Sequence, residues 1–257
     1  MTGELLCVGD LNADITITAV EAIAVGSDTP GSVVMSGGGS AANVAAWAAE
    51  AGADGFMSRF VGVVGDDELG DFLIDELAGH GVDVRVIRRE STASRAIAAI
   101  VGGDGNRSMV SALDPATVLG TADVDPAWYD GVGWLHLTGY TFLQSAGRAT
   151  FARLIASAEE RSMPWSLDPS SATMLAAGAE RGDVADAFAG AAVMFPSHDE
   201  AEWLADAADP VAAAELLLDL SDTVVVTCGA DGAVVARRGS PTFSIEAAPA
   251  ALVNTLG

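Results

Sequence analysis

The stretch GGGSAANVA, residues 37–45, decides the fold of this chain. Glycine permits close backbone approach and hinge-like dihedral angles, so we expect a turn there. Ser40 is placed to cap a helix, and the alanine-rich run over residues 40–51 favours one. Asn43 is a poor helix former in the first turn of that helix, which makes it a candidate binding residue. The alternative is a plain ribbon-to-helix turn, since the stretch is not a dinucleotide fingerprint after a strand.

Short apolar strands alternate with helical stretches on both sides of this turn, which predicts a mostly parallel sheet covered on both faces. The expected strands cover residues 5–9, 56–64, 133–137, 164–168, 191–195 and 223–227. The expected helices cover residues 40–51, 66–79, 146–161 and 210–220. Two β-rich segments, residues 14–35 and 84–110, interrupt the alternation and predict a small flap. We therefore expect a single domain over residues 1–257 with these two segments as its lid.

The charge balance is extreme, with 36 acidic residues against 12 basic ones and a net charge of −24. Every basic residue is arginine, which excludes a P-loop lysine, a Schiff base and a catalytic lysine. No basic stripe exists, so nucleic acid is not an expected partner. A solvated acidic surface is the simplest explanation, and adaptation to salt is a hypothesis consistent with it.

The sequence also bears on the location of the protein. No apolar run approaches the roughly 18–20 residues that a membrane span needs. The N-terminus has no basic region of the kind a signal peptide carries. Cys7 and Cys228 lie in apolar runs, and we expect buried thiols in a reducing cytoplasm.

The motif GDLNAD, residues 9–14, follows the first expected strand. Open α/β sheets bind ligands at the carboxyl ends of their strands, and Asn12 and Asp14 suit sugar hydroxyls. The alternative is a simple turn, which Asn and Asp also favour. The motif VGVVGDDELG, residues 61–70, is interpreted as structural: a strand, a turn and a capped helix.

Two further motifs lie in the second half of the chain. In FPSHDE, residues 195–200, Ser197 and Glu200 form a capping-box pattern, and Glu200 is alternatively placed near a magnesium–phosphate site. In TCGADG, residues 227–232, the glycines indicate either a turn between strands or backbone N–H groups that meet phosphates. The final VNTLG, residues 253–257, begins the glycine-rich turn that feeds a helix N-terminus, where anions bind.

Taken in order, these motifs resemble the ribokinase-like, or PfkB-type, carbohydrate and nucleoside kinases. The resemblance runs from residue 5 to the last residue, and it includes Gly105-Asn106-Arg107 and Asp168-Pro169. It implies a three-layer α/β/α core with a small β lid, and transfer of the γ-phosphoryl group of ATP to a sugar or nucleoside hydroxyl. It also implies that Mg²⁺ assists.

The resemblance assigns roles to particular residues. The substrate-binding residues are Asn12, Asp14, Gly38, Gly39, Asn43 and Arg107. The ATP-binding residues are Ser197, Thr227, Gly229, Gly232, Asn254 and Thr255. Glu200 would organise Mg²⁺, directly or through water, and Gly257 would form part of the anion hole.

The sequence departs from the family pattern at two places. Ser197 stands where the family has asparagine, so we expect a phosphate or metal-water contact to be lost. Asn254 stands where the closing Asp-Thr-x-Gly-Ala-Gly-Asp motif has its first aspartate, and the sequence stops at the first glycine of that motif. The expected base therefore falls beyond Gly257. Losing a general base alone typically costs ~10²–10⁴ in rate, so we expect a very weak kinase or none.

Two other functions were weighed. A non-catalytic sugar- or nucleotide-binding remnant of the family would keep the pocket and lack the chemistry. A nucleotide-cofactor oxidoreductase is disfavoured because no dinucleotide fingerprint is present. Homodimerisation through the lid is expected by analogy, and the sequence does not identify the sugar or nucleoside.

Overall fold

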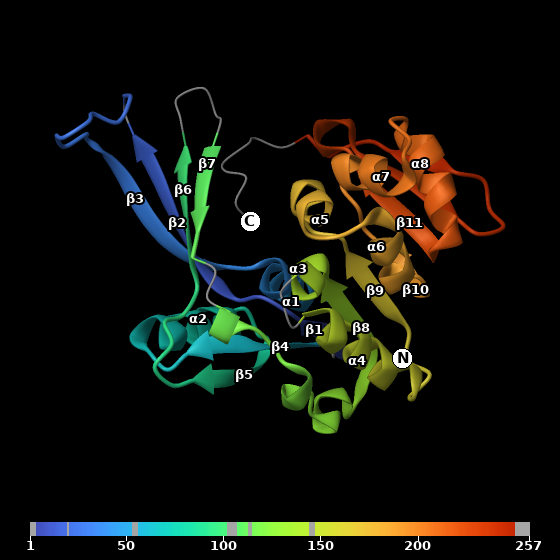
Figure 1. The fold of residues 1–257 in the computed structure, drawn as a ribbon, viewed down its shortest axis with the longest axis horizontal. Coiled ribbons are helices and arrows are strands. Elements are labelled where there is room, and N and C mark those ends of the chain that lie inside the picture. Colours follow the sequence, from blue (N-terminus) through green and yellow to red (C-terminus); the bar gives the residue numbers. More distant parts are fainter. Residues whose placement is uncertain are drawn as a thin grey trace.

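The computed structural model describes residues 4–19, 21–52, 56–101, 107–112, 115–143 and 147–249. A large twisted sheet with helices packed on it forms the body, and a smaller sheet extends from one end (Figure 1). Among the described residues, no helix combines the length and the apolar character that crossing a bilayer would require.

The large sheet has nine strands in the order β13-β12-β11-β10-β9-β8-β1-β4-β5. They are β1 (Glu4–Val8), β4 (Met57–Gly65), β5 (Asp83–Arg89), β8 (Val132–Thr138), β9 (Trp165–Asp168), β10 (Ala191–Met194), β11 (Ser221–Thr227), β12 (Ala233–Arg237) and β13 (Phe243–Ile245). Pairing is parallel from β5 through β11, and β12 and β13 are antiparallel. The expectation of a mostly parallel central sheet is therefore confirmed.

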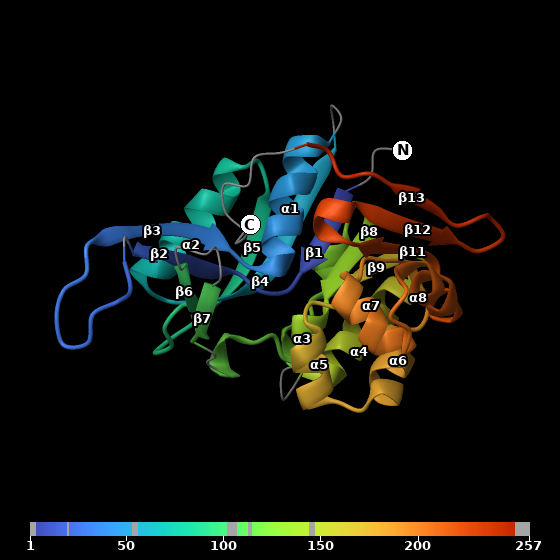
Figure 2. The ribbon, with the colours of Figure 1, turned by 90° about the horizontal axis from the view of Figure 1, so that it is seen from above.

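Helices cover both faces of this sheet, which confirms the three-layer α/β/α core. They are α1 (Ser40–Ala51), α2 (Glu68–Gly79), α3 (Gly139–Leu143), α4 (Gly147–Glu159), α5 (Ala172–Gly178), α6 (Arg181–Phe188), α7 (His198–Ala205) and α8 (Pro210–Leu216). Seen from above, α1 and α2 lie on one face, and α3, α4, α6, α7 and α8 lie on the other (Figure 2). Short 3₁₀ turns, such as Pro115–Thr117 and Gly229–Asp231, complete the connections.

All six expected strands form within two residues of their expected ends, and so do the starts of the four expected helices. The helix expected over 210–220 ends at Leu216 and continues as the 3₁₀ turn Leu217–Asp219. The sequence did not reveal α3, α5 or α6, which are short. Cys7 is buried as expected, whereas Cys228 is only partly buried.

The smaller sheet is the flap, with strand order β3-β2-β6-β7. Its strands are β2 (Asn12–Ala19), β3 (Gly31–Gly38), β6 (Ala96–Val101) and β7 (Arg107–Ser111). The second lid segment, expected from residue 84, was wrong at its start. β5 pairs in parallel with β4 along Asp83–Arg89 and forms the edge of the central sheet, because its apolar residues pack beside α2. That the two sheets form one domain stays a prediction.

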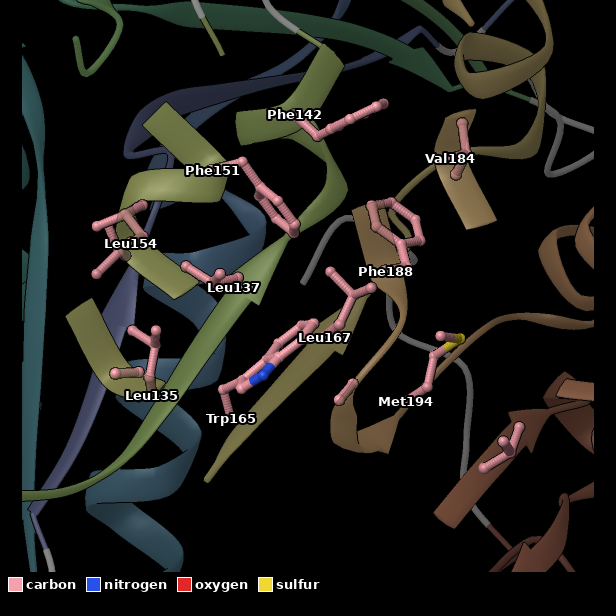
Figure 3. Close-up of a cluster of buried hydrophobic side chains, with 14 of the residues drawn as sticks. Leu135, Leu137, Phe142, Phe151, Leu154, Trp165, Leu167, Val184, Phe188 and Met194 are labelled. Carbon is pink, nitrogen blue, oxygen red and sulfur yellow. The ribbon is translucent and has the colours of Figure 1, made fainter. Parts of the chain in front are cut away.

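Side-chain alternation along the strands feeds two cores. Leu6 and Val8 of β1 join the core on the side of α3–α8, whereas Cys7 joins the core under α1 and α2. The first core holds large side chains from β8, β9, α4 and α6 (Figure 3). The second relies on alanines of α1, which let that helix lie close to β1: a Cβ on Gly9 would lie 2.8 Å from Cβ of Ala41.

Phe151 is central to the first core, and it tests the packing directly. It is 1% exposed, and its ring lies 5.8 Å from that of Phe142 and 5.7 Å from that of Phe188. We expect Phe151→Ala to lower the free energy of unfolding by about 3–5 kcal/mol, measured by urea denaturation. Phe243→Ala, at a side chain that is 54% exposed, is the control and should cost less than about 1 kcal/mol. Equal losses for the two variants would contradict this packing.

Candidate active site

The site begins where β1 ends, and Asp10 organises it. Its carboxylate accepts hydrogen bonds from the backbone N–H groups of Ser40, at 2.9 Å, and Ala41, at 3.5 Å. These groups open helix α1, where a negative charge is stabilised by the helix dipole. Ser40 was expected to cap this helix itself; instead the N-cap is Gly39, and Asp10 supplies the capping carboxylate from the β1–β2 turn.

The glycines before α1 are required by close contacts. A Cβ on Gly38 would lie 2.2 Å from Oδ2 of Asp14, and one on Gly39 would lie 2.4 Å from the carbonyl oxygen of Asp10. Gly39 also has φ near 110°, which side chains rarely adopt. Gly38 pairs with Asn12 in the flap sheet, so the expected substrate residues of β2 and β3 lie side by side.

Asn12 and Asp14 form a polar pair at the base of the flap. Asn12 is fully buried, and its Nδ2 donates to Oδ1 of Asp14 at 2.8 Å. Its Oδ1 is buried and receives no hydrogen bond from the described residues. Burial raises the pKa of the Asp14 carboxyl; the bond from Asn12 opposes this, and the charge of Asp10 adds to it. The pair therefore presents an unused acceptor, as a hydroxyl-binding site would.

Asn43 and Arg107 lie apart from this pair in their contacts. Asn43 is in the first turn of α1, where its backbone N–H donates to the carbonyl of Gly39. Its side chain is partly buried. Arg107 begins β7, opposite Val101 of β6, and its side chain lies outside the described part of the chain.

Asp168, at the end of β9, links the two halves of the site. Its Oδ1 accepts from the backbone N–H of Ser170 at 2.8 Å, and its Oδ2 accepts from the hydroxyl of Ser40 at 3.4 Å. Burial raises the pKa of the Asp168 carboxyl, the two hydrogen bonds oppose the rise, and the charge of Asp10 adds to it. An acid held against its ionisation in this way is typical of functional sites.

Ser197 and Glu200 form the expected capping box at the start of α7. The Ser197 N–H donates to Oε2 of Glu200 at 2.8 Å, and the Glu200 N–H donates to the Ser197 hydroxyl at 3.4 Å. Glu200 is only 7% exposed. Burial raises the pKa of its carboxyl, the bond from Ser197 opposes this, and the charge of Asp168 adds to it.

The loop after β11 lies beside this box. Ser197 and Thr227 form a parallel bridge, and the Thr227 N–H donates to the carbonyl of Pro196 at 2.9 Å. Gly229 and Gly232 both have positive φ, and a Cβ on Gly232 would lie 1.9 Å from the carbonyl oxygen of Ile245. The turn expected between two strands is present, and its Gly229 has open space beside it.

The structure thus brings the expected residues together in two groups on one edge of the sheet. One lies at β1 and the flap, and the other at β10 and β11, four strand spacings or roughly 19 Å away. Asp168 lies between them and interacts electrostatically with both Asp10 and Glu200. Sequence reasoning did not assign roles to Asp10 or Asp168, although each directly follows a strand. Asn254, Thr255 and Gly257 lie outside the described residues.

Magnesium fits this edge through oxygen donors. Within the described ranges, no group of three or more His, Cys, Asp or Glu side chains is arranged to hold a metal directly. The carboxylates of Asp168 and Glu200 are nevertheless the donor type that Mg²⁺ prefers, and that ion usually keeps several of its waters. Contact through water is therefore the mode these residues suit.

A mostly parallel α/β/α protein with a ligand edge under a β flap is the layout of the ribokinase-like kinases. The adenosine kinase of Sinorhizobium meliloti superposes with a TM-score of 0.84 at 22% identity, covering 98% of this chain and 82% of that one. A putative ribokinase II from E. coli, in its apo form, gives a TM-score of 0.82 at 20% identity, covering 98% and 80%. At these identities the likeness concerns the fold.

The sequence shows the family. The model of the pfkB family of carbohydrate kinases matches residues 2–257, and the chain belongs to that family. An ATP-dependent ribose-1-phosphate kinase from Halopiger xanaduensis is 31% identical over 95% of this chain and 78% of its own length. A fructokinase from Klebsiella pneumoniae is 31% identical over 60% of this chain, and the match spans 47% of that protein.

Gly39 gives a test of the hinge at α1. We expect Gly39→Ala to destabilise the protein by about 1–3 kcal/mol, because φ near 110° strains the residue and the new Cβ meets the carbonyl of Asp10. Gly79→Ala is the matched control: it lies in α2 with nothing within 4 Å, and it should stabilise by about 0.5–1 kcal/mol. Urea denaturation of both variants measures the difference, and a tolerated Gly39→Ala would refute the hinge geometry.

Asp168 gives a pH test. Because its folded-state pKa is raised, ionisation of this carboxyl destabilises the fold above that pKa, and the penalty disappears as pH falls below the unfolded pKa of about 3.9. We expect Asp168→Asn to raise the free energy of unfolding at pH 7, with the gain shrinking toward pH 4. Chemical denaturation at both pH values measures it. A loss of stability at pH 7 would show that the carboxylate stabilises the fold instead.

Proposed function

We propose that this chain carries out ATP-dependent phosphoryl transfer to a hydroxyl group of a sugar or nucleoside. The observation that carries the proposal is the pairing of two groups on one sheet edge. Asn12, with its buried and unused carbonyl oxygen, lies in one, and the glycine loop at 229–232 lies in the other. Asp168 and Glu200 lie between them and suit a cation that accompanies phosphates.

The acceptor side has groups that recognise hydroxyls. Asn12 Oδ1 accepts a hydrogen bond from a substrate hydroxyl, and the free oxygen of Asp14 accepts another. Gly38 and Gly39 let the backbone approach the substrate, and they join the flap to α1. Arg107 and Asn43 are assigned to the same side through the family pattern.

The donor side has groups that suit a nucleotide. The loop from Thr227 to Gly232 offers backbone N–H groups to the phosphates of ATP. Glu200 orients the waters of Mg²⁺, which neutralises charge on the transferring phosphoryl group. In the transfer, the acceptor oxygen bonds to the γ-phosphorus, the bond from that phosphorus to the β–γ bridging oxygen breaks, and the hydroxyl proton is released. ADP is the leaving group.

The relatives leave the acceptor open. Their names refer to fructose, ribose 1-phosphate, 2-dehydro-3-deoxygluconate and adenosine. Ring hydroxyls are common to fructose, ribose and adenosine, and Asn12 with Asp14 suits any neighbouring pair of them. The acceptor class is therefore a small polyol, free or linked to a base.

Location and assembly are part of the same proposal. We expect the chain in the cytoplasm, where ATP is plentiful, without nucleic-acid or membrane partners. Homodimerisation through the flap is supported by its exposed apolar residues, with Val33 70% and Val110 71% exposed on the two outer strands.

Release of ADP tests the function. The 257-residue chain, Mg²⁺ and ATP are incubated with fructose, ribose, adenosine or gluconate, and binding of each acceptor is measured by calorimetry. We expect acceptor-dependent ADP with at least one compound, and Asn12→Ala should lower kcat/KM by about tenfold. Thr18→Ala, exposed on the same strand, is the control and should leave it unchanged.

The outcomes separate the candidate functions. Acceptor binding without ADP release would favour the non-catalytic binding protein. Absence of both binding and turnover across the panel would overturn the proposal.

A further inference from the structure

Arg95 is a buried cation that the proposed function does not use. It is 7% exposed, and its Nε is buried without a hydrogen-bond partner. Among the described residues, no carboxylate lies within ion-pair distance of it, unlike most arginines of this chain. A buried charge without an opposite charge is costly, so its presence calls for an explanation.

Arg59 shows what a structural buried arginine looks like in the same molecule. It is 6% exposed, yet it pairs with Glu4 and Asp83 at 2.8 Å each. Its Nη1 also donates to the carbonyls of Trp128 and Asp130. Arg59 is thus fully engaged within the chain, and Arg95 is not.

The position of Arg95 is built rather than incidental. Its carbonyl accepts from the N–H of Ala13 at 2.9 Å, which places it next to Asn12 at the base of the flap. The preceding Ser94 is held on both sides: its N–H and hydroxyl donate to Asp67 at 2.8 and 2.6 Å, and its hydroxyl accepts from the N–H of Gly65 at 3.0 Å. The motif at 61–70, interpreted as structural, therefore fixes the backbone from which Arg95 extends.

Arg95 lines a small pocket with Gly9, Asp10, Val63, Thr117 and Thr141. The pocket lies at the carboxyl ends of β1 and β4. It shares its rim with the acceptor group of the site, since Gly9 and Asp10 lead directly to Asn12. The Asp10 carboxylate is already bound to the start of α1, which reduces its repulsion of an incoming anion.

The pocket lies on the side of the acceptor away from ATP. In the sheet, β4 is five strand spacings from β11, where the donor group lies, and that is roughly 24 Å. The anion that Arg95 suits is therefore a second charged group on the acceptor, and not the transferring phosphoryl group. Net charge does not explain such a preference, because a chain with −24 repels anions.

We propose that Arg95 recognises an anionic group of the acceptor substrate, so that the preferred acceptors are sugars or nucleosides bearing a phosphate or a carboxylate. This inference rests on the proposed function and names its substrate class. A guanidinium suits both groups through paired N–H donors. Arg95 is thereby a specificity-determining residue of the acceptor pocket.

The binding experiment compares matched pairs on the 257-residue chain by calorimetry: ribose with ribose 5-phosphate, fructose with fructose 6-phosphate, and glucose with gluconate. We expect at least one anionic member to bind about tenfold or more tightly than its neutral partner. In Arg95→Met that ratio should fall to about one, Arg95→Lys should retain part of it, and the exposed Arg237→Met should retain all of it.

A stability experiment on the ligand-free variants decides independently. Without a partner inside the chain, Arg95→Met should leave the thermal midpoint unchanged or raise it, whereas Arg59→Met should lower it by several degrees. A loss for Arg95→Met as large as that for Arg59→Met would show a structural arginine and overturn the proposal.

The outcomes distinguish this proposal from the one beneath it. Equal binding of neutral and anionic members, with acceptor-dependent ADP release intact, would overturn the role of Arg95 and leave the kinase function standing. Failure of every sugar to bind would overturn both. The phosphate and carboxylate pairs show which anion the pocket selects.

Discussion

The Asp10 carboxylate on the first N–H groups of α1 is the interaction on which the site depends. It joins the end of β1 to the start of the helix, and Gly39 lies in contact with the same turn. Because Gly9 and Ala41 leave so little space, α1 lies close against the central strand. The flap enters through Asn12 and leaves through Gly38, so this one junction sets where the flap stands over the sheet edge.

A row of acids follows from that junction. Asp10, Asp168 and Glu200 come from the ends of β1 and β9 and the start of α7, and each is bound by backbone N–H groups. Their mutual repulsion and burial raise the pKa of both Asp168 and Glu200. Such an arrangement costs stability in the free protein, and it is suited to holding a hydrated cation together with phosphates.

Much of the fold followed from the sequence because apolar strands between capped helices leave a clear pattern. The strands ending at Val8 and Thr227 and the alanine-rich α1 were evident in this way. β5 was taken for flap because its side chains alternate like those of a ribbon, and only its pairing with β4 places it in the main sheet. Asp10 and Asp168 escaped assignment because their partners, Ser40 and each other, are 30 to 128 residues away in sequence. Arg95 carried no local signal, since its lack of a carboxylate partner exists only in three dimensions.

The central claim is that one sheet edge holds two separate subsites, with the acceptor at β1 and the flap and the nucleotide at β10 and β11. Amide chemical shifts by NMR test it most directly. Mg·ATP should shift Ser197, Thr227, Gly229 and Gly232 most strongly, whereas an acceptor sugar should shift Asn12, Gly38 and Gly39. Ligands that shift the same set of amides, or that leave both sets unchanged, would contradict the claim.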